Sequence, residues 1–187
     1  MVKINAVTTR TGDDGTTGLV DGSRLDKSAP RMDAIGDVDE TNSVIGIARV
    51  GLDDEALDRM LSHIQNDLFD LGADLATPAE IEGALRIHLS QVERLEADMS
   101  GLLEHLKPLD SFVLPGGSPS AAALHGARAV CRRAERTCVE LDRQDSLNPQ
   151  LLAYMNRLSD FLFVAARWCN DRGEADVKWV PGETRNA

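Results

Sequence analysis

The sequence predicts an all-α protein, a bundle of five helices that follows an irregular N-terminal loop. Apolar residues recur every three or four positions through most of the chain, which is the spacing of one buried helix face. Serine, asparagine and proline stand where several of these stretches would begin. Apart from the short Phe112-Val-Leu114, no stretch alternates apolar and polar residues as a half-buried strand does. Because the connections are short, neighbouring helices should run antiparallel.

Each expected helix has its own start signal or apolar stripe. Ser90-Gln-Val-Glu93 has the form of a capping box that opens the third helix, which should end before Pro108. Ser118-Pro119 and Asn148-Pro149 each place a capping residue before a proline in the first turn, so they open the fourth helix, which runs to about Arg143, and the fifth. The apolar positions of the first, second, third and fifth helices are Ile35, Val38, Ile45 and Ala48; Leu57, Met60, Leu61, Ile64, Leu68, Leu71 and Leu75; Val92, Leu95, Met99, Leu102, Leu103 and Leu106; and Leu152, Met155, Leu158, Leu162, Ala165 and Cys169.

A loop rich in glycine and threonine precedes the helices. Residues 8–18 contain three glycines, five threonines and one arginine, and we expect no regular structure there. Glycine permits positive φ angles and a close approach of the backbone to a ligand, so successive N–H groups can converge on phosphate oxygens. Threonine hydroxyls and Arg10 would add donors. The segment therefore predicts a polyphosphate-binding loop, with a solvated turn as the alternative. It is not a Walker loop, because no Gly-Lys-Ser/Thr follows its glycines.

Length and charge limit the possible functions. A chain of 187 residues, 42% of them apolar, predicts a single domain over residues 1–187, divided into a loop (1–30), a bundle (about 31–172) and a C-terminal tail (173–187). The formal net charge of -11 argues against nucleic acid or an anionic membrane as a partner. No charged-then-apolar leader follows Met1 and no apolar run is long enough to span a membrane, which predicts a cytoplasmic protein.

The cysteines and histidines do not indicate a metal site. The three cysteines include no Cys-x-x-Cys pair, so we expect all three to be buried as small apolar residues. A di-iron bundle needs glutamate three residues before histidine on inward faces, and none of the four histidines has one. We therefore expect no dedicated metal site, and we expect the histidines, His63, His88, His105 and His125, at the surface or at helix caps.

The fourth helix carries an unusual set of charges for so acidic a chain. Arg128, Arg132 and Glu135 follow one another at spacings of four and three, and Arg133 and Arg136 lie beside them. The opposite face is small, since it presents only alanines and cysteines. The fifth helix has a matching polar stripe, and the first interrupts its apolar face at two positions. The set on the fifth helix is Asn156, Asp160, Phe163 and Arg167, and the set on the first helix is Asp39 and Asn42. Together these polar sets predict a site or a polar subunit interface, with a solvated helix face as the alternative.

Five motifs together resemble the PduO-type ATP:corrinoid adenosyltransferases. They occur in the family's order and extend from residue 8 to about 170. The motifs are Thr9-Arg-Thr-Gly-Asp-Asp-Gly-Thr-Thr17, Gly36-Asp-Val-Asp-Glu-Thr-Asn42, Phe112-Val-Leu-Pro-Gly-Gly-Ser118, Ala127-Arg-Ala-Val-Cys-Arg-Arg-Ala-Glu-Arg136 and Asn156-Arg-Leu-Ser-Asp160. The resemblance implies a five-helix, ferritin-like bundle that assembles as a homotrimer with active sites between subunits. It also implies the reaction, in which a Co(I) corrinoid attacks the 5′ carbon of Mg-ATP to give adenosylcobalamin and triphosphate.

The resemblance also implies roles for individual residues. Phe112 matches the aromatic residue that excludes the lower axial ligand of cobalt, and Asp39 and Arg128 match a salt bridge across the subunit boundary beside the corrin ring. Arg132 matches a residue that both binds ATP and takes part in catalysis. The positions that match ATP contacts are Thr9, Arg10, Thr11, Gly12, Asp13, Gly15, Thr17 and Lys27 in one subunit and Arg132, Arg133, Glu135 and Asn156 in its neighbour. A reductase that supplies the electron and an adenosylcobalamin-dependent acceptor enzyme are possible partners.

The chain departs from the family pattern at a few places. Thr41 stands where leucine is usual, and Val20-Asp21 replaces a more usual glycine-containing pair. These departures concern substrate preference more than the reaction, and residues 173–187 match little of the family. The alternative function is a non-catalytic corrinoid carrier or a nucleotide-sensing interaction protein on the same bundle.

Overall fold

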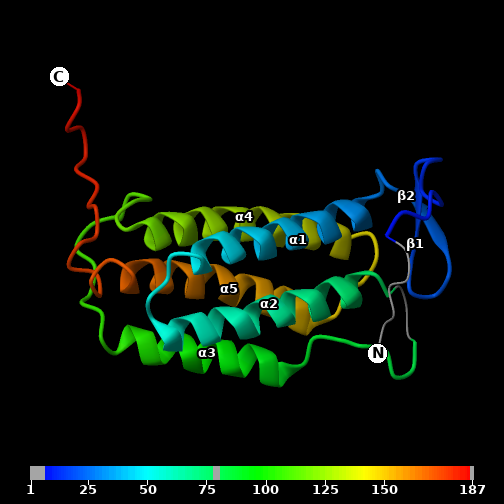
Figure 1. Cartoon of the computed structure of the whole chain (residues 1–187), viewed down its shortest axis with the longest axis horizontal. Helices are drawn as coiled ribbons and strands as arrows, with labels where there is room; N and C mark the ends of the chain where they lie inside the picture. Colours follow the sequence, from blue (N-terminus) through cyan, green and yellow to red (C-terminus); the bar gives the residue numbers. More distant parts are fainter. Residues whose placement is uncertain (1–6, 78–80, 186–187) are drawn as a thin grey trace.

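Five helices lie side by side in the computed structural model, which describes residues 7–77 and 81–185 (Figure 1). They are α1 (Pro30–Arg49), α2 (Glu55–Leu75), α3 (Leu89–Leu103), α4 (Pro119–Asp142) and α5 (Pro149–Trp168). A small hairpin of β1 (Thr16–Gly18) and β2 (Arg24–Asp26) precedes α1 at one end of the bundle. The predicted five-helix bundle is confirmed. Part of the connection between α2 and α3, residues 78–80, lies outside the described residues.

The helices pack through one continuous apolar core. Helix α4 lies against both α1 and α5, while α3 packs on α5 and α2 on α1. The face of α4 that makes this close packing possible consists of small residues without solvent exposure, Ala127, Cys131, Ala134 and Cys138. Tyr154 and Phe161 of α5 are the largest fully buried side chains. The small face predicted for the fourth helix is therefore the inner face of the bundle.

Helix starts follow the predicted caps with one exception. The side chains of Ser118 and Asn148 accept hydrogen bonds from the first turns of α4 and α5. The prediction for α3 was wrong by two residues, because this helix begins after His88 and not after Ser90. Gln91 Oε1 accepts a hydrogen bond from His88 N at 2.8 Å, while its amide nitrogen donates to Asp67 of α2 at 2.9 Å. The contact with α2 thus favours Gln91 over Glu93 as the capping residue.

The expectation that residues 8–18 lack regular structure was wrong for the last three of them. Thr16–Gly18 pairs in antiparallel register with Arg24–Asp26, so that Thr16 lies opposite Asp26. The turn between them is closed by a hydrogen bond from Leu19 N to Ser23 O at 2.9 Å and contains Gly22 at a φ of 83°. β-branched threonines suit a strand, and the tight turn brings a partner strand within reach.

The cysteines are less uniformly buried than expected. Cys131 and Cys138 are buried, whereas Cys169, in the turn after α5, is half-buried, so the prediction was wrong for this residue. Burial raises the pKa of the Cys138 thiol to about 12 and that of Cys169 to about 11, which keeps both protonated near neutral pH. Among the helices of the described residues, none combines the length and apolarity needed to cross a membrane.

Candidate functional site

The glycine- and threonine-rich loop presents its polar side chains outward. Arg10 has a φ of 61° and Gly15 a φ of 85°, so the backbone turns sharply on both sides of Gly12. Lys27 reaches back across the loop and donates from Nζ to Gly12 O at 2.7 Å. A Cβ atom at Gly12 would lie only 2.9 Å from Lys27 Nζ and 3.1 Å from Thr16 O, so a larger residue there would displace the lysine side chain from this contact. Gly12 and Thr17 are half-buried. The other loop residues that match ATP contacts are exposed, namely Thr9, Arg10, Thr11, Asp13, Gly15 and Lys27.

Arg24 holds the two sides of this loop together, and the sequence analysis did not single it out. It donates from Nε to Thr16 Oγ1 at 2.9 Å and from Nη2 to Thr11 O at 2.6 Å. Thr9 and Thr11 are also joined through their hydroxyls at 2.9 Å. Arg24 lies on β2, so only the hairpin pairing, which the sequence analysis did not anticipate, places it beside the loop.

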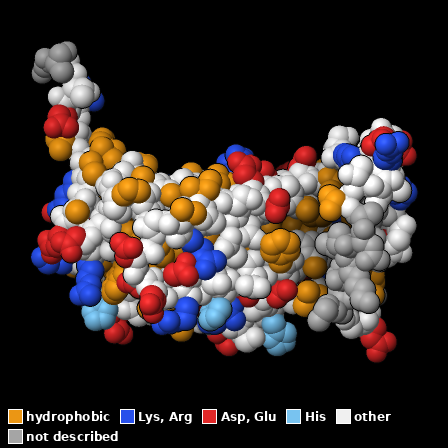
Figure 2. All heavy atoms as spheres, viewed as in Figure 1, with side chains coloured by type: hydrophobic (Ala, Val, Ile, Leu, Met, Phe, Trp, Pro, Cys, Tyr) orange, Lys and Arg blue, Asp and Glu red, His pale blue; other side chains and the backbone are white. Residues whose placement is uncertain are grey.

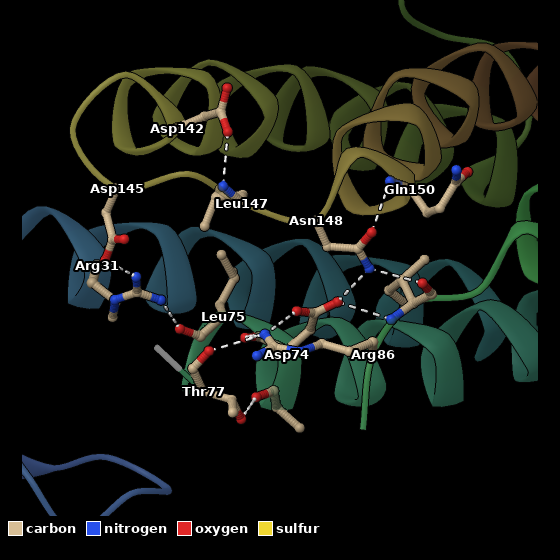
Figure 3. A network of polar contacts seen from close by, with 12 residues as sticks. Arg31, Asp74, Leu75, Thr77, Arg86, Asp142, Asp145, Leu147, Asn148 and Gln150 are labelled. Carbon is tan, nitrogen blue, oxygen red and sulfur yellow. Dashed lines mark hydrogen bonds and ion pairs between the residues drawn. The ribbon is translucent and has the colours of Figure 1, made fainter. Parts of the chain in front are cut away.

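A second network fixes the end of the bundle from which the hairpin projects (Figure 3). The buried carboxylate of Asp74 accepts hydrogen bonds from Arg86 Nη1 at 2.7 Å and from Ile87 N and Asn148 Nδ2 at 2.8 Å. Arg31, at the start of α1, is buried and bonds to Leu75 O and to Asp145. The network therefore joins the ends of α2 and α4 to the beginnings of α1, α3 and α5, at the end of the bundle where the hairpin lies.

The polar groups predicted on α4 and α5 divide into two sets. Asn156 Nδ2 donates to Glu135 Oε1 at 2.8 Å, so α4 and α5 do bring these two residues together. Arg132 is exposed beside them and lines a surface groove with Glu135 and other charged residues of α4. Arg133 points away from this pair toward α1, where it bonds to Asp37 at 3.2 Å and to Glu40. Within one chain, Arg133 is thus an interhelix contact.

Arg128 and Asp39 do not pair within the chain. Arg128 Nε on α4 is buried and has no hydrogen-bond partner among the described residues. Asp39 is exposed and lines a mainly apolar cavity between α1 and α2, together with Phe69 and Asn42. The Oδ1 atom of Asn42 also lacks a partner within residues 7–77 and 81–185. Two buried polar atoms, Arg128 Nε on α4 and Asn42 Oδ1 on α1, are therefore left for a ligand or another copy of the chain to satisfy.

His125 is buried, contrary to the expectation that the histidines lie at the surface or at caps. It is 2% exposed, neither ring nitrogen finds a partner in the described part of the chain, and the ring meets Phe163 edge-on at 6.1 Å. Desolvation, with the nearby positive charge of Arg128 as a smaller cause, lowers the pKa of His125, so the imidazole is neutral at pH 7. His88 is at a helix cap, and His63 and His105 are exposed, as predicted.

Phe112 lies in the connection between α3 and α4, with 76% of its surface exposed. Its ring meets Trp179 of the C-terminal tail edge-on, with centroids 6.0 Å apart. Phe112 is therefore not part of the apolar core of the single chain. Figure 2 shows apolar side chains gathered at this end of the bundle. The large exposed ones that the connection and the tail contribute are Leu109, Phe112, Leu114, Val177, Trp179 and Val180.

The glycine- and threonine-rich loop and Phe112, the two parts of the candidate site, lie at opposite ends of the bundle. The hairpin and its loop are at the end where α1 begins, whereas the α3–α4 connection that carries Phe112 is at the other end (Figure 1). One chain therefore does not bring the loop to Phe112. No cluster of three or more potential metal-binding side chains occurs among the residues that the structure describes.

The fold and the site define the class as a five-helix bundle protein with an exposed loop rich in glycine and threonine at one end and an exposed aromatic residue at the other. The family model described as cobalamin adenosyltransferase matches residues 7–169. A cobalamin adenosyltransferase from Cupriavidus metallidurans is 48% identical over 179 residues, which cover 95% of both chains. A corrinoid adenosyltransferase from Mycobacterium tuberculosis is 47% identical over 193 residues, covering 100% of this chain and 98% of the relative.

A solved structure agrees with these relatives. A variant PduO-type ATP:corrinoid adenosyltransferase from Lactobacillus reuteri, complexed with cobalamin and ATP, superposes with a TM-score of 0.88 at 36% identity and covers 94% of this chain and 97% of that chain. The chain belongs to the cobalamin adenosyltransferase family. The resemblance inferred from the five motifs is thereby confirmed, and with it the assignment as a transferase enzyme.

Proposed function

We propose that the protein transfers the 5′-deoxyadenosyl group of Mg-ATP to the cobalt of a Co(I) corrinoid. The observation that carries the proposal is that the match to the cobalamin adenosyltransferase family, over residues 7–169, spans both the exposed loop and the Phe112 connection. The L. reuteri relative, complexed with cobalamin and ATP, supports the same pair of substrates. Magnesium enters with ATP and needs no dedicated protein ligands.

The reaction has a simple electron balance. The electron pair of Co(I) forms the cobalt–carbon bond at C5′, while the C5′–oxygen bond breaks and its pair leaves on triphosphate. The protein can lower the activation barrier of this reaction by stabilising the negative charge that collects on the departing triphosphate. The phosphates would be held by the backbone N–H groups of the loop and by the side chains of Thr9, Arg10, Thr11 and Lys27. Arg132, which is exposed and offers a planar fork of donors, would bind the departing triphosphate.

Two copies of the chain would complete each site. The loop and Phe112 lie at opposite ends of one bundle. Among the described residues Arg128 Nε has no hydrogen-bond partner, and no ion pair joins Arg128 to Asp39. We propose a homotrimer in which the loop of one copy meets Arg132, Arg133, Glu135 and Asn156 of the next. Asp39 and Arg128 would pair across the same boundary, beside the corrin ring. Arg133 would then have to exchange or share its contacts with Asp37 and Glu40.

Phe112 would act on the lower face of the corrin. Its exposure leaves the ring free to occupy the space of the lower axial base of a bound Co(II) corrinoid. Without that donor the cobalt becomes four-coordinate, and the orbital that accepts the next electron falls in energy. A separate reductase would supply this electron in the cytoplasm, and an adenosylcobalamin-dependent enzyme would receive the product.

The decisive experiment combines the purified protein with Mg-ATP and chemically reduced cobalamin. The expected products are light-sensitive adenosylcobalamin and triphosphate in equal amounts. Binding of cobalamin and ATP without either product would instead favour a non-catalytic carrier or a nucleotide-sensing protein. Formation of ADP or AMP in place of adenosylcobalamin would show cleavage of a phosphorus–oxygen bond and would contradict cleavage at C5′.

A further inference from the structure

The C-terminal tail folds back onto the connection that carries Phe112. Leu114 N donates to Val177 O at 2.7 Å, and Trp179 N donates to Phe112 O at 2.8 Å. Ser111 Oγ adds a hydrogen bond to Trp179 O at 2.7 Å. These bonds make a short antiparallel bridge between Val113 and Lys178. The family model ends at residue 169, so the tail that makes these contacts lies beyond the matched region.

Asp176 ties the beginning of this tail to α5. Its side chain is 1% exposed and accepts a hydrogen bond from Arg167 Nε at 2.8 Å. Arg167, itself almost fully buried, also donates from Nη2 to Lys107 O at 2.9 Å, in the segment that leads from α3 toward Phe112. Contrary to a solvated polar stripe on α5, Arg167 is thus the centre of a buried contact between three segments.

Asn170 extends the contact to the far side of the connection. Its Oδ1 accepts from Ser118 N at 2.9 Å, and its Nδ2 donates to Gly116 O at 3.1 Å and to Asp176 Oδ1 at 3.4 Å. Gly117 has a φ of 100°, and a Cβ atom there would lie 2.1 Å from Asn170 Oδ1. The amide of Asn170 therefore occupies the space that any side chain at residue 117 would need.

We infer that Asp176 is a positioning residue for Phe112. Through Arg167 and Asn170 it fixes the tail to α5, and the tail in turn fixes the Phe112 connection by backbone pairing and by the Phe112–Trp179 ring contact. The inference has a structural part and a catalytic part. The structural part is that loss of the Asp176 charge loosens the Phe112 connection, and it depends only on the contacts described above. The catalytic part depends in addition on the role proposed for Phe112.

Loss of the buried Arg167–Asp176 ion pair should have a larger effect than loss of the nearby exposed Lys178–Asp110 pair. Removing one member of a buried ion pair leaves the other charge without compensation, which is strongly destabilising locally. Lys178 and Asp110 also join the tail to the connection, at 2.7 Å, but their side chains are 52% and 74% exposed. Such a pair contributes little in water. Asp110→Asn is therefore the matched control for Asp176→Asn.

The first test follows amide hydrogen exchange in the full-length protein without ligands. In Asp176→Asn, peptides that contain Leu114 and Trp179 should exchange at least about tenfold faster than in the parent, whereas peptides from α2 and the middle of α4 should not change. Asp110→Asn should exchange like the parent. Parent-like protection of Leu114 and Trp179 in Asp176→Asn would overturn the inference.

A second pair of variants covers the case in which Asp176→Asn does not fold. Trp179→Pro removes the N–H that bonds to Phe112 O, while Trp179→Ala removes the same ring and keeps the N–H. Trp179 is 42% exposed, so neither change disturbs the core. Faster exchange at Leu114 in the proline variant than in the alanine variant is expected if backbone pairing holds the connection. Equal exchange in the two would overturn that part of the inference.

The catalytic consequence is read from cobalt coordination. With ATP bound and well below the melting temperature, Asp176→Asn should convert at most about half as much Co(II)alamin to the four-coordinate form as Asp110→Asn, with ATP affinity unchanged. An unchanged four-coordinate fraction would limit Asp176 to a structural role. If the parent forms no four-coordinate Co(II) while the exchange behaves as expected, the proposed role of Phe112 fails and the structural part of the inference survives.

Discussion

Arg132 on α4 is exposed next to the Glu135–Asn156 pair, and its guanidinium is engaged in no ion pair among the described residues. Arg133 is held by acidic residues of α1, and Arg143 pairs with Glu140 at 3.0 Å. A free guanidinium can form two parallel hydrogen bonds to a phosphate, which an ammonium group cannot.

Arg132→Lys should therefore lower kcat/KM for ATP by about tenfold to a hundredfold, the equivalent of losing one charge-assisted hydrogen bond of about 1.5–3 kcal/mol. Circular dichroism and melting temperature should match the parent, because the side chain is exposed. Arg143→Lys is the control and should retain parent kinetics. Near-normal ATP kinetics in the Arg132 variant would remove this arginine from the site.

Phe112→Ala separates a role on cobalt from a role in folding. Since 76% of the residue is exposed, we expect a change in unfolding free energy of at most about 1 kcal/mol. The loss should instead appear in the reaction that starts from Co(II), while pre-formed Co(I), already four-coordinate, should react nearly as in the parent. Spectroscopy with ATP bound should show far less four-coordinate Co(II). A variant that melts early yet keeps the parent's cobalt signal would assign Phe112 to packing alone.

Helix α2 depends on a single carboxylate at its start. Asp54 Oδ1 accepts hydrogen bonds from Leu57 N at 2.9 Å and Ala56 N at 3.0 Å, and Trp168 Nε1 donates to Oδ2 at 2.9 Å. These bonds, that from Leu57 N first and that from Trp168 next, lower the pKa of Asp54 from its ordinary value of 3.8. The carboxylate thus joins the start of α2 to the end of α5.

Asp54→Asn should reduce the free energy of unfolding by about 1 kcal/mol at pH 7, because the neutral amide loses the favourable charge at the helix N-terminus and the charge-assisted hydrogen bonds from the first turn and from Trp168. A depressed folded-state pKa adds stability above the unfolded value of 3.8 and loses it as the pH falls through the folded value. The difference between parent and variant should therefore shrink below about pH 3.8. Urea titrations at several pH values measure it, with exposed Asp53→Asn as the control. A difference that is independent of pH would contradict the charge argument.

Local chemistry predicted most elements, and tertiary contacts decided the exceptions. Proline and a capping residue at Ser118 and Asn148 fix the starts of α4 and α5 from the sequence alone. The start of α3 escaped prediction because Gln91 is selected by its bond to Asp67 on another helix. The strand Thr16–Gly18 escaped because a three-residue strand exists only through its partner, which the pattern of apolar residues does not reveal.

At the scale of the whole molecule, the motifs predicted the family, whereas the single chain does not bring the loop close to the connection that carries Phe112. The loop and the Glu135–Asn156 pair are both present, but Arg128 and Asp39 stay unpaired, so their salt bridge remains a prediction. The tail could not be interpreted from sequence because Asp176 acquires its role only by meeting Arg167 and Asn170 after the chain reverses. Such long-range polar contacts have no local signature.

The surface of the single chain is consistent with association. Ile47, Val50 and Phe69 are 65%, 89% and 72% exposed, and Phe69 lines the cavity that also contains Asp39. Apolar side chains of this size beside buried, unpartnered polar atoms are typical of a surface that another protein covers. A homotrimer would cover them and would place the loop of one copy against α4 and α5 of the next.

Co-expression of two inactive variants tests whether the site is shared. Lys27→Ala damages the loop, and Arg132→Ala removes the whole guanidinium from α4, so each trimer made of one variant should be nearly inactive. If loop and α4 come from different copies, random mixing leaves about a quarter of the interfaces with both parts intact, and about a quarter of the parent's activity should return. Purified single-variant trimers mixed without subunit exchange provide the control and should stay inactive. Light scattering should report a trimer throughout. Absence of recovered activity in verified mixed trimers, or a fully active monomer, would place the complete site within one chain.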